Sequence, residues 1–287
     1  MKIPVLPTTL IQRAKNGDIE ALDALLHGIQ PGVFNLAVRM LGNREDARDA
    51  TQEILLKVTT HLATFRGEAA FNTWVYQVAR NHLLSASTRS REPPEVSLEN
   101  LGEHLRAGLE LGHSTWQDRV LTPEEKASSR EMAVACTQGM LMRLDREHRL
   151  AYVLDVAFGL PSAQAAEVLG IGAAAYRKRL SRARQALQGV SSSVCGMVNA
   201  QASCRCEKQV HAVTLHSAAG GVRPGLTMSL ERAEREAASQ ALDEVMALGD
   251  IAEVMRSHPD YQAPSALAAG IRAVLVSYGQ VNQDRLN

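Results

Sequence analysis

The stretch from Ser162 to Leu187 reads SAQAAEVLGIGAAAYRKRLSRARQAL, and it decides the fold class. Its first part predicts a short helix with Ser162 as the N-cap. Gly170 then stands at a corner, where a helix-turn-helix needs a positive φ that glycine adopts at low cost. The second part predicts an amphipathic helix that buries Tyr176 and Leu180. The stretch therefore predicts a helix-turn-helix within an all-α protein.

The second helix of this pair is strongly basic. It carries five cationic residues, and no acidic residue occurs between Ala173 and Gln188. The whole chain has 31 Lys and Arg against 31 Asp and Glu, so this positive charge is local. A cationic helix behind such a turn binds DNA phosphates and places its first residues in the major groove. The predicted phosphate-binding residues are Arg177, Lys178, Arg179, Arg182 and Arg184.

Composition supports a globular helical protein. Hydrophobic residues make up 45%, charged residues 22% and aromatic residues only 4% of the chain, which favours helices packed through Ala, Leu and Val. No run of about eighteen apolar residues occurs, so no membrane span is expected. The first ten residues lack the length of a secretory signal, and a cytoplasmic location is expected. Structural disulfides are then not expected among the four cysteines.

The chain divides into four predicted parts. Residues 10–92 form three amphipathic helices, with Gly42 as a stop and Asn43 as the next cap. Residues 93–122 contain Pro93-Pro94, lose periodicity and form a flexible linker. Residues 123–190 form a second helical block that begins at Pro123 and ends with the helix-turn-helix. Residues 191–287 form a helical, cysteine-containing C-terminal extension.

Two segments carry a family resemblance. DARDATQEILLKVTTHLATFRGEAAFNTWVYQVARNHLL, which begins at Asp46, resembles region 2 of the extracytoplasmic-function group of sigma-70 family factors. LDREHRLAYVLDVAFGLPSAQAAEVLGIGAAAYRKRLSRARQAL, which begins at Leu144, resembles region 4 of the same group. The resemblance covers about residues 10–190, with both regions in the family's order. It implies a sigma factor that binds core RNA polymerase and directs promoter recognition and transcription initiation.

The resemblance also implies roles for individual residues. Asp49, Gln52 and Glu53 match the region-2 helix that docks on the β′ clamp helices of polymerase, and region 4 would dock on the β flap. The −35 element would be read through Ala173, Ala174, Arg177 and Lys178. Arg179, Arg182 and Arg184 would then face phosphates or acidic groups of the domain itself.

A second set of DNA contacts is implied at the −10 element. Tyr76 falls in the segment associated with strand opening and is expected to face solvent or a base, whereas Phe71 and Trp74 are expected in the core. Arg80, Asn81 and His82 match the motif before the −10 recognition loop, where an unpaired base would be held. The sequence departs from the family after this motif, because Ser and Thr residues stand where arginines are common, which weakens the expected −10 contacts.

The extension contains Cys195, Cys204, Cys206 and His211 in the pattern C-x8-C-x-C-x4-H. Three thiols and an imidazole could supply the four ligands of a zinc ion, although the spacing lacks a C-x2-C pair. A redox-responsive cluster is an alternative, because nearby Arg and Lys residues favour thiolates, and unpaired cytoplasmic thiols are another. Cys136 is expected in the core of its helix. No cofactor is required by the sequence.

Alternatives to the sigma-factor interpretation remain open. An ordinary helix-turn-helix regulator would bind duplex DNA without polymerase. An enzyme is not expected, because the chain has no Gly-rich phosphate loop, no G-x-S-x-G and no H-E-x-x-H. The extension either folds back on region 2 or region 4 and gates access to polymerase or DNA, or it docks a regulator. The expected partners are core RNA polymerase, promoter DNA and an anti-sigma factor, with no membrane.

Overall fold

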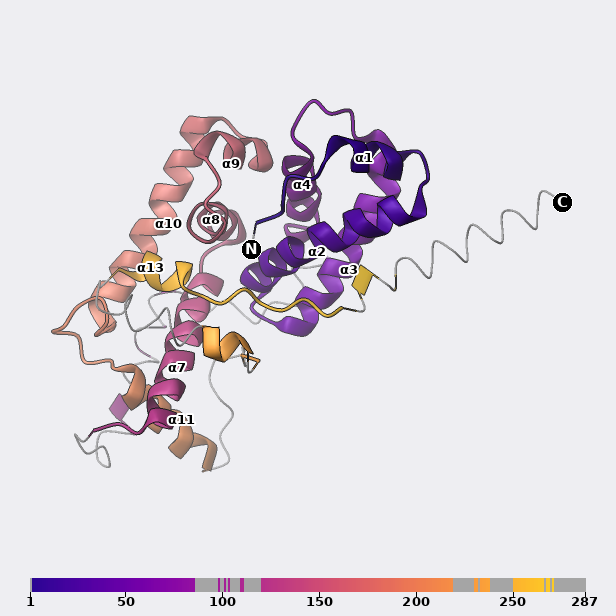
Figure 1. Cartoon of the computed structure of the whole chain (residues 1–287). Coiled ribbons are helices and arrows are strands. Elements are labelled where there is room, and N and C mark those ends of the chain that lie inside the picture. The colour runs from indigo at the N-terminus through magenta and orange to yellow at the C-terminus, as the bar shows by residue number, and fades with distance from the viewer. Residues whose placement is uncertain are drawn as a thin grey trace. The chain divides into compact units, whose positions relative to one another are not determined.

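The computed structural model describes residues 2–85, 120–218 and 250–265, with short stretches at 98, 101, 103, 109–110, 230–231, 233–237, 267–268 and 270. All regular elements of these residues are helices (Figure 1), and their one strand-like feature is an isolated bridge between Cys195 and Cys204. The predicted all-α class is confirmed. Within the same residues, no helix is both long and apolar enough to cross a bilayer. Most of the predicted linker 93–122 lies outside the described residues.

The chain forms two compact units. Unit 1 comprises residues 1–91, 161–173 and 261–287, and unit 2 comprises residues 92–160 and 174–260. The predicted parts 123–190 and 191–287 therefore each contribute to both units.

Unit 1 is built on three long helices, α2 (Ile19–Leu41), α3 (Arg44–His61) and α4 (Phe71–Leu83), preceded by α1 (Thr8–Lys15). Gly42 ends α2 in the left-handed conformation, with φ of 68°. The Asn43 side chain then caps α3 by accepting from the backbone N–H groups of Glu45 and Asp46. The predicted stop and cap are confirmed, and they turn α3 back against α2 so that both bury an apolar face.

Two later segments complete unit 1. The first is α9 (Ser162–Leu169), which packs against α4. Pro161, and not Ser162, is its N-cap, because the backbone at Pro161 is extended and Ser162 is already helical. The second is the segment that begins at Tyr261 and lies against α2, where the Asn35 and Gln30 side chains bind its backbone.

Polar side chains of α2 hold this second segment. Asn35 Nδ2 donates to Tyr261 O at 2.9 Å, and Asn35 Oδ1 accepts from Tyr261 N at 2.9 Å. Gln30 makes a similar pair with Pro264 O (2.9 Å) and Ala268 N (3.0 Å). The Arg39 guanidinium lies 4.7 Å from the centre of the Tyr261 ring, and both side chains are buried. The contacts explain why an otherwise apolar helix carries three buried polar residues.

Unit 2 contains α7 (Pro123–Met142), α8 (Arg146–Tyr152), a π-helical turn η2 (Val153–Ala157), α10 (Ala173–Val194), α11 (Cys206–Ala218) and α13 (Ile251–Arg256). Thr122 and Glu125 form a capping box at the start of α7, with Pro123 in the first turn as predicted. The buried Arg149 side chain caps the other end of α7 by donating to the carbonyls of Leu141, Met142 and Leu144. The serines 191–193 continue α10, so no break follows residue 190.

The C-terminal extension also contacts unit 2. α13 packs against α7 and η2. His258, which is buried just after α13, bonds through Nε2 to the Thr137 hydroxyl of α7 at 2.7 Å. Part of the extension therefore belongs to the core of each unit. The described residues of the extension thus contact α2 in unit 1 and α7 and η2 in unit 2. A gating role of the extension remains a prediction.

Candidate nucleic-acid interface

The corner of the predicted helix-turn-helix has the expected geometry. α9 ends at Leu169, Gly170 has φ of 63°, and α10 begins at Ala173. The backbone N–H groups of Gly170 and Ile171 donate to Glu167 O and Ala166 O and close the end of α9. The segment is therefore two helices with a glycine corner and not one continuous helix.

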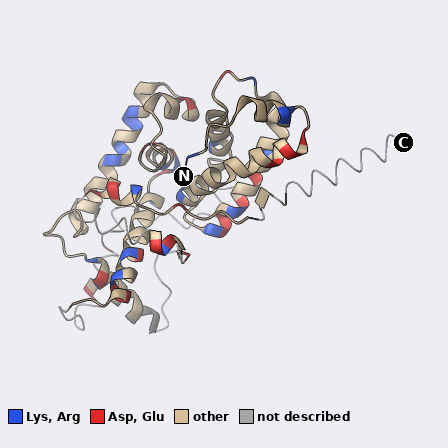
Figure 2. Cartoon of the chain, in the orientation of Figure 1, with Lys and Arg blue, Asp and Glu red and all other residues tan. Residues whose placement is uncertain are grey.

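α10 has a buried face and an exposed basic face. Tyr176 and Leu180 are buried as predicted, and the Tyr176 hydroxyl donates to Ala151 O at 3.3 Å. Lys and Arg positions recur along α10 (Figure 2). The exposed members of the predicted DNA-binding set are Ala173, Ala174, Arg177, Lys178, Arg182 and Arg184.

Two arginines of α10 are tied to unit 2 by ion pairs. Arg179 lies 2.7 Å from Glu147 of α8, and Arg184 lies 2.5 Å from Asp155 of η2. Arg177, Lys178 and Arg182 form no ion pair with the described part of the chain. Arg179 and Arg184 therefore hold α10 against α8 and η2. Arg177, Lys178 and Arg182 are available to an anionic ligand.

The predicted polymerase-binding residues share one exposed face of α3. Asp49, Gln52 and Glu53 are all exposed, while Ala50 and Ile54 on the other face are buried. The face is polar and acidic on balance, and the segment that begins at Tyr261 binds side chains of α2 and Arg44 instead. Asp49, Gln52 and Glu53 are thus exposed on one face of α3, where the Asp49 carboxylate also forms an ion pair with Arg48 at 3.8 Å.

The structure corrects two expectations for α4. Tyr76 does not face solvent: it is fully buried, and its hydroxyl accepts from Ile3 N at 3.0 Å. Burial raises the pKa of its hydroxyl well above the ordinary value. His82 is also buried, and its Nδ1 lies 2.9 Å from Lys57 Nζ. Neither ring is open to a base, because helical periodicity places residues 76, 79 and 83 on one inner face of α4.

The other two residues of the predicted −10 site are accessible. Asn81 is exposed, Arg80 is partly exposed, and Arg80 NH1 donates to Asn81 Oδ1 at 3.1 Å. Phe71 is buried and Trp74 partly so, in an aromatic cluster with Phe65 that agrees with the expected core role. The predicted −10 set is therefore reduced to Arg80 and Asn81.

α9 covers part of α4 within unit 1. Gln77 Nε2 donates to Glu167 O at 3.1 Å, and Gln164 Nε2 donates to the Thr73 hydroxyl at 3.0 Å. Gly170 lies close to the same helix, since a Cβ placed on it would stand 3.7 Å from Arg80 NH1. The first helix of the helix-turn-helix thus contacts the helix that carries Arg80 and Asn81.

Replacing Gly170 with alanine is expected to lower the free energy of unfolding by about 1–2 kcal/mol, because L residues pay roughly this much for left-handed backbone. Space is not limiting at this position. Gly189→Ala is the control, because Gly189 lies inside α10 with nothing within 4 Å of an added Cβ. That change should stabilise the protein by up to about 1 kcal/mol. Urea unfolding of both variants measures the change in the free energy of unfolding. If both variants change it in the same direction, the left-handed strain assigned to position 170 is contradicted.

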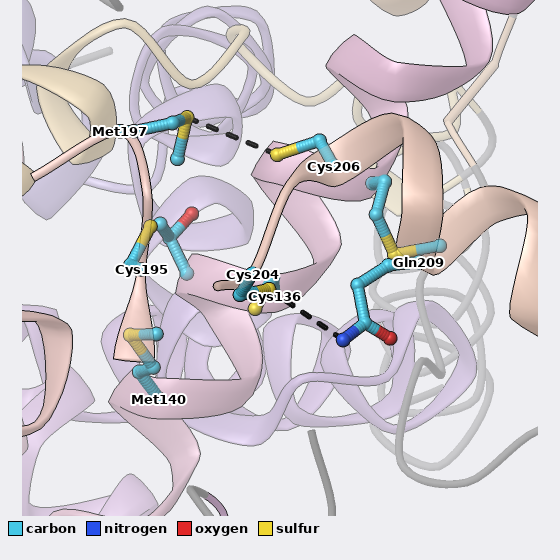
Figure 3. Close-up of a pocket in the computed structure, with 9 residues that line it drawn as sticks. Cys136, Met140, Cys195, Met197, Cys204, Cys206 and Gln209 are labelled. Atoms are coloured by element: carbon cyan, nitrogen blue, oxygen red, sulfur yellow. Dashed lines mark hydrogen bonds between the residues drawn. The ribbon is translucent and has the colours of Figure 1, made fainter. Parts of the chain in front are cut away.

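The four residues of the predicted metal site do not come together as expected. Cys195, Cys204 and Cys206 are buried and line one cavity of unit 2 (Figure 3). His211 lies on α11 but is not among the residues that line this cavity. Cys136 of α7, which was expected only to pack in the core of its helix, lines the cavity instead. Met132 and Met140 lie four residues before and after Cys136, so the three residues share one face of α7. This spacing was the sequence signal for a sulfur-rich helix face.

Comparisons with known proteins show which family the chain belongs to. The chain matches the family models Sigma-70 region 2 at residues 25–92 and Sigma-70, region 4 at residues 135–187. The RNA polymerase sigma-H factor of Pseudomonas aeruginosa is 30% identical over 188 residues, which cover 62% of this chain and 90% of that protein. The ECF RNA polymerase sigma-E factor of Haemophilus influenzae is 30% identical and SigW of Bacillus subtilis 27% identical, each covering 62% of this chain and 92% of the relative.

The chain therefore belongs to the extracytoplasmic-function group of the sigma-70 family. A solved complex of the sigma factor RpoE with the anti-sigma factor NepR from Bartonella quintana is more distant, with 18% identity and a TM-score of 0.35 over 62% of this chain and 96% of that chain.

Proposed function

We propose that the protein binds core RNA polymerase and directs it to promoters, with α3 as a polymerase-docking element and α10 as the reader of the −35 element. One observation carries the proposal: a region-2 unit with Asp49, Gln52 and Glu53 exposed on one helix face and a region-4 helix with exposed Arg177 and Lys178 occur in one chain. The first turns of such a helix reach base edges in the major groove, and its arginines also bind phosphates.

The −10 element is assigned to α4 through Arg80 and Asn81. Both lie at the end of α4, where a guanidinium and an amide could hold a displaced base by hydrogen bonds. Tyr76 and His82 have no part in this proposal because they are buried. The protein works as a regulatory subunit rather than as an enzyme, in the cytoplasm where its polymerase partner acts. An anti-sigma factor is a further proposed partner, because the family resemblance implies one.

Run-off transcription with purified core polymerase and a library of promoter fragments tests the function. The expected result is enrichment of fragments that share two elements, one for each DNA-binding part, and only when core polymerase is present. An ordinary helix-turn-helix regulator would instead select one duplex operator without polymerase. Selection by the isolated protein, with no selected transcript, would replace the sigma-factor proposal by that alternative.

Replacing both Asp49 and Glu53 with alanine is expected to weaken binding to core polymerase by up to about tenfold, because exposed charge pairs contribute about 0.2–1 kcal/mol each and every 1.4 kcal/mol is a factor of ten. Fluorescence anisotropy of a labelled protein titrated with core enzyme measures the affinity. Glu45→Gln serves as the control, since Glu45 is an exposed acidic residue in the first turn of the same helix. Equal affinities for the double variant and the parent protein would exclude this face as the docking site.

A further inference from the structure

Four cysteine thiols from three segments of unit 2 line a single small cavity. Cys136 comes from α7, Cys195 follows α10, Cys204 lies in the loop, and Cys206 begins α11. Figure 3 shows them around the pocket together with Met140 and Met197. The cavity volume is about 20 Å³, close to what one water molecule or one unhydrated ion requires. All four cysteines of the chain therefore line the same cavity, although they span seventy-one positions of the sequence, from 136 to 206.

The backbone around the cavity holds two of the thiol-bearing residues opposite each other. Cys195 and Cys204 form a parallel β-bridge, in which Gly196 N donates to Cys204 O at 2.9 Å and Cys204 N donates to Val194 O at 3.3 Å. A Cβ on Gly196 would stand 2.4 Å from Cys204 O, so only glycine permits this approach. The Arg205 guanidinium binds the carbonyls of Ala200, Ala202 and Cys204 and fixes the loop.

The surroundings of the thiols are apolar and rich in sulfur. Met132, Met140 and Met197 complete the lining with Thr137 and Gln209. Cys206 Sγ lies 3.9 Å from Met197 Sδ, and Gln209 Nε2 lies 3.5 Å from Cys204 Sγ. Burial raises the pKa of Cys136 to about 12 and raises the pKa values of Cys204 and Cys206 above the ordinary thiol value. The raised pKa values of Cys136, Cys204 and Cys206 favour the protonated thiol, which works against the thiolate-based redox alternative.

We propose that Cys136, Cys195, Cys204 and Cys206 bind one thiophilic metal cation, with Cys136 in place of His211 as the fourth ligand. Each thiol that binds releases its proton to solvent, and its sulfur electron pair forms the bond to the metal. As the described residues stand, no group of three or more Cys, His, Asp or Glu side chains could hold a metal ion. The proposal therefore includes a rearrangement of the thiols when the cation binds.

Two cations share the chemistry that this lining offers. Zinc prefers a closed tetrahedron of four thiolates, whereas cuprous copper also accepts thioethers such as those of the three methionines. A hard cation is excluded because the ligands are sulfur atoms in an apolar cavity. The site would join α7 to α11, which already pack together in unit 2.

The test uses the full chain, reduced and stripped of metal, titrated with Co²⁺ as a zinc substitute. The expected result is one equivalent bound, with sulfur-to-cobalt charge-transfer absorption of four thiolates. Cys136→Ser should reduce that absorption by about a quarter and weaken binding at least tenfold, as ligand loss exceeds the roughly tenfold or larger effect of losing an outer-shell partner. His211→Ala is the matched control and should change neither property.

A second titration with Cu⁺ in competition with a chromogenic chelator separates the two cations. If copper is the ligand, Met197→Leu weakens Cu⁺ binding and leaves Co²⁺ binding unchanged; if zinc is, the variant changes neither. Cys206→Ser, on a different helix, should repeat the Cys136→Ser result, so that misfolding of one variant does not decide the outcome. Absence of stoichiometric binding of both ions, or loss of binding in His211→Ala with full binding in Cys136→Ser, would overturn the proposal.

Discussion

Replacing both Arg177 and Lys178 with alanine is expected to lower promoter-directed transcription about a hundredfold or more at limiting protein. Both side chains are exposed at the start of α10 and form no ion pair within the described residues. Each contact of this type with DNA is worth about 1–3 kcal/mol, and every 1.4 kcal/mol is a factor of ten. Run-off transcription over a range of protein concentrations measures the change.

The control for this variant lies on the same helix. Gln185 is exposed on α10 and carries no charge, so Gln185→Ala should leave transcription within about twofold. Binding of the double variant to core polymerase should also be unchanged, because the proposed docking face is on α3. If transcription by the double variant equals that of the parent protein, α10 does not read the promoter.

Replacing Tyr261 with alanine is expected to release the docked part of the extension from α2. The change removes a fully buried ring, which typically costs about 3–5 kcal/mol, and with it the stacking of Arg39. The backbone N–H groups of residues 261 and 268 donate to Asn35 and Gln30, so their hydrogen exchange reports the docking directly. A loss of about 3 kcal/mol corresponds to exchange that is more than a hundredfold faster.

Two further variants make the test of docking specific. Asn35→Ala removes both hydrogen bonds to residue 261 from the other side and should accelerate exchange at the same amides. Ser265→Ala is the control, because Ser265 is exposed, and exposed substitutions usually change stability by less than about 0.5 kcal/mol. Unchanged exchange in Tyr261→Ala and Asn35→Ala would show that the extension does not depend on these contacts.

Local patterns predicted much of the fold and of the DNA-binding face. Gly170 at the corner, Asn43 as a cap and the open Arg177 and Lys178 follow from backbone preference and helical periodicity, which act within a few residues. Tyr76 was mispredicted because its partner, Ile3 N, is seventy-three residues away. A polar ring on an amphipathic helix can face either way until such a partner is known.

Long-range packing also decided what the sequence could not predict in the extension. Residues 261–264 are irregular, so they have no periodicity that could predict their docking on α2. The sequence signal was on α2, since Gln30, Asn35 and Arg39 are polar residues in the mostly buried and apolar part of that helix, residues 29–40. In the same way, Cys136 joined the thiol cluster only through the packing of α7 against α11.

The contact between α9 and α4 has a thermodynamic consequence for promoter choice. Two side-chain hydrogen bonds, from Gln77 and Gln164, join these helices, and such bonds are worth about 0.5–1.5 kcal/mol each. We call the form with α9 against α4 closed and the form with α4 uncovered open. If promoter opening requires the open form, the apparent affinity for promoter DNA falls in proportion to the fraction of open molecules, roughly 5- to 150-fold. The intact factor would then impose a threshold, so that only promoters with enough binding energy at both elements compete successfully for it.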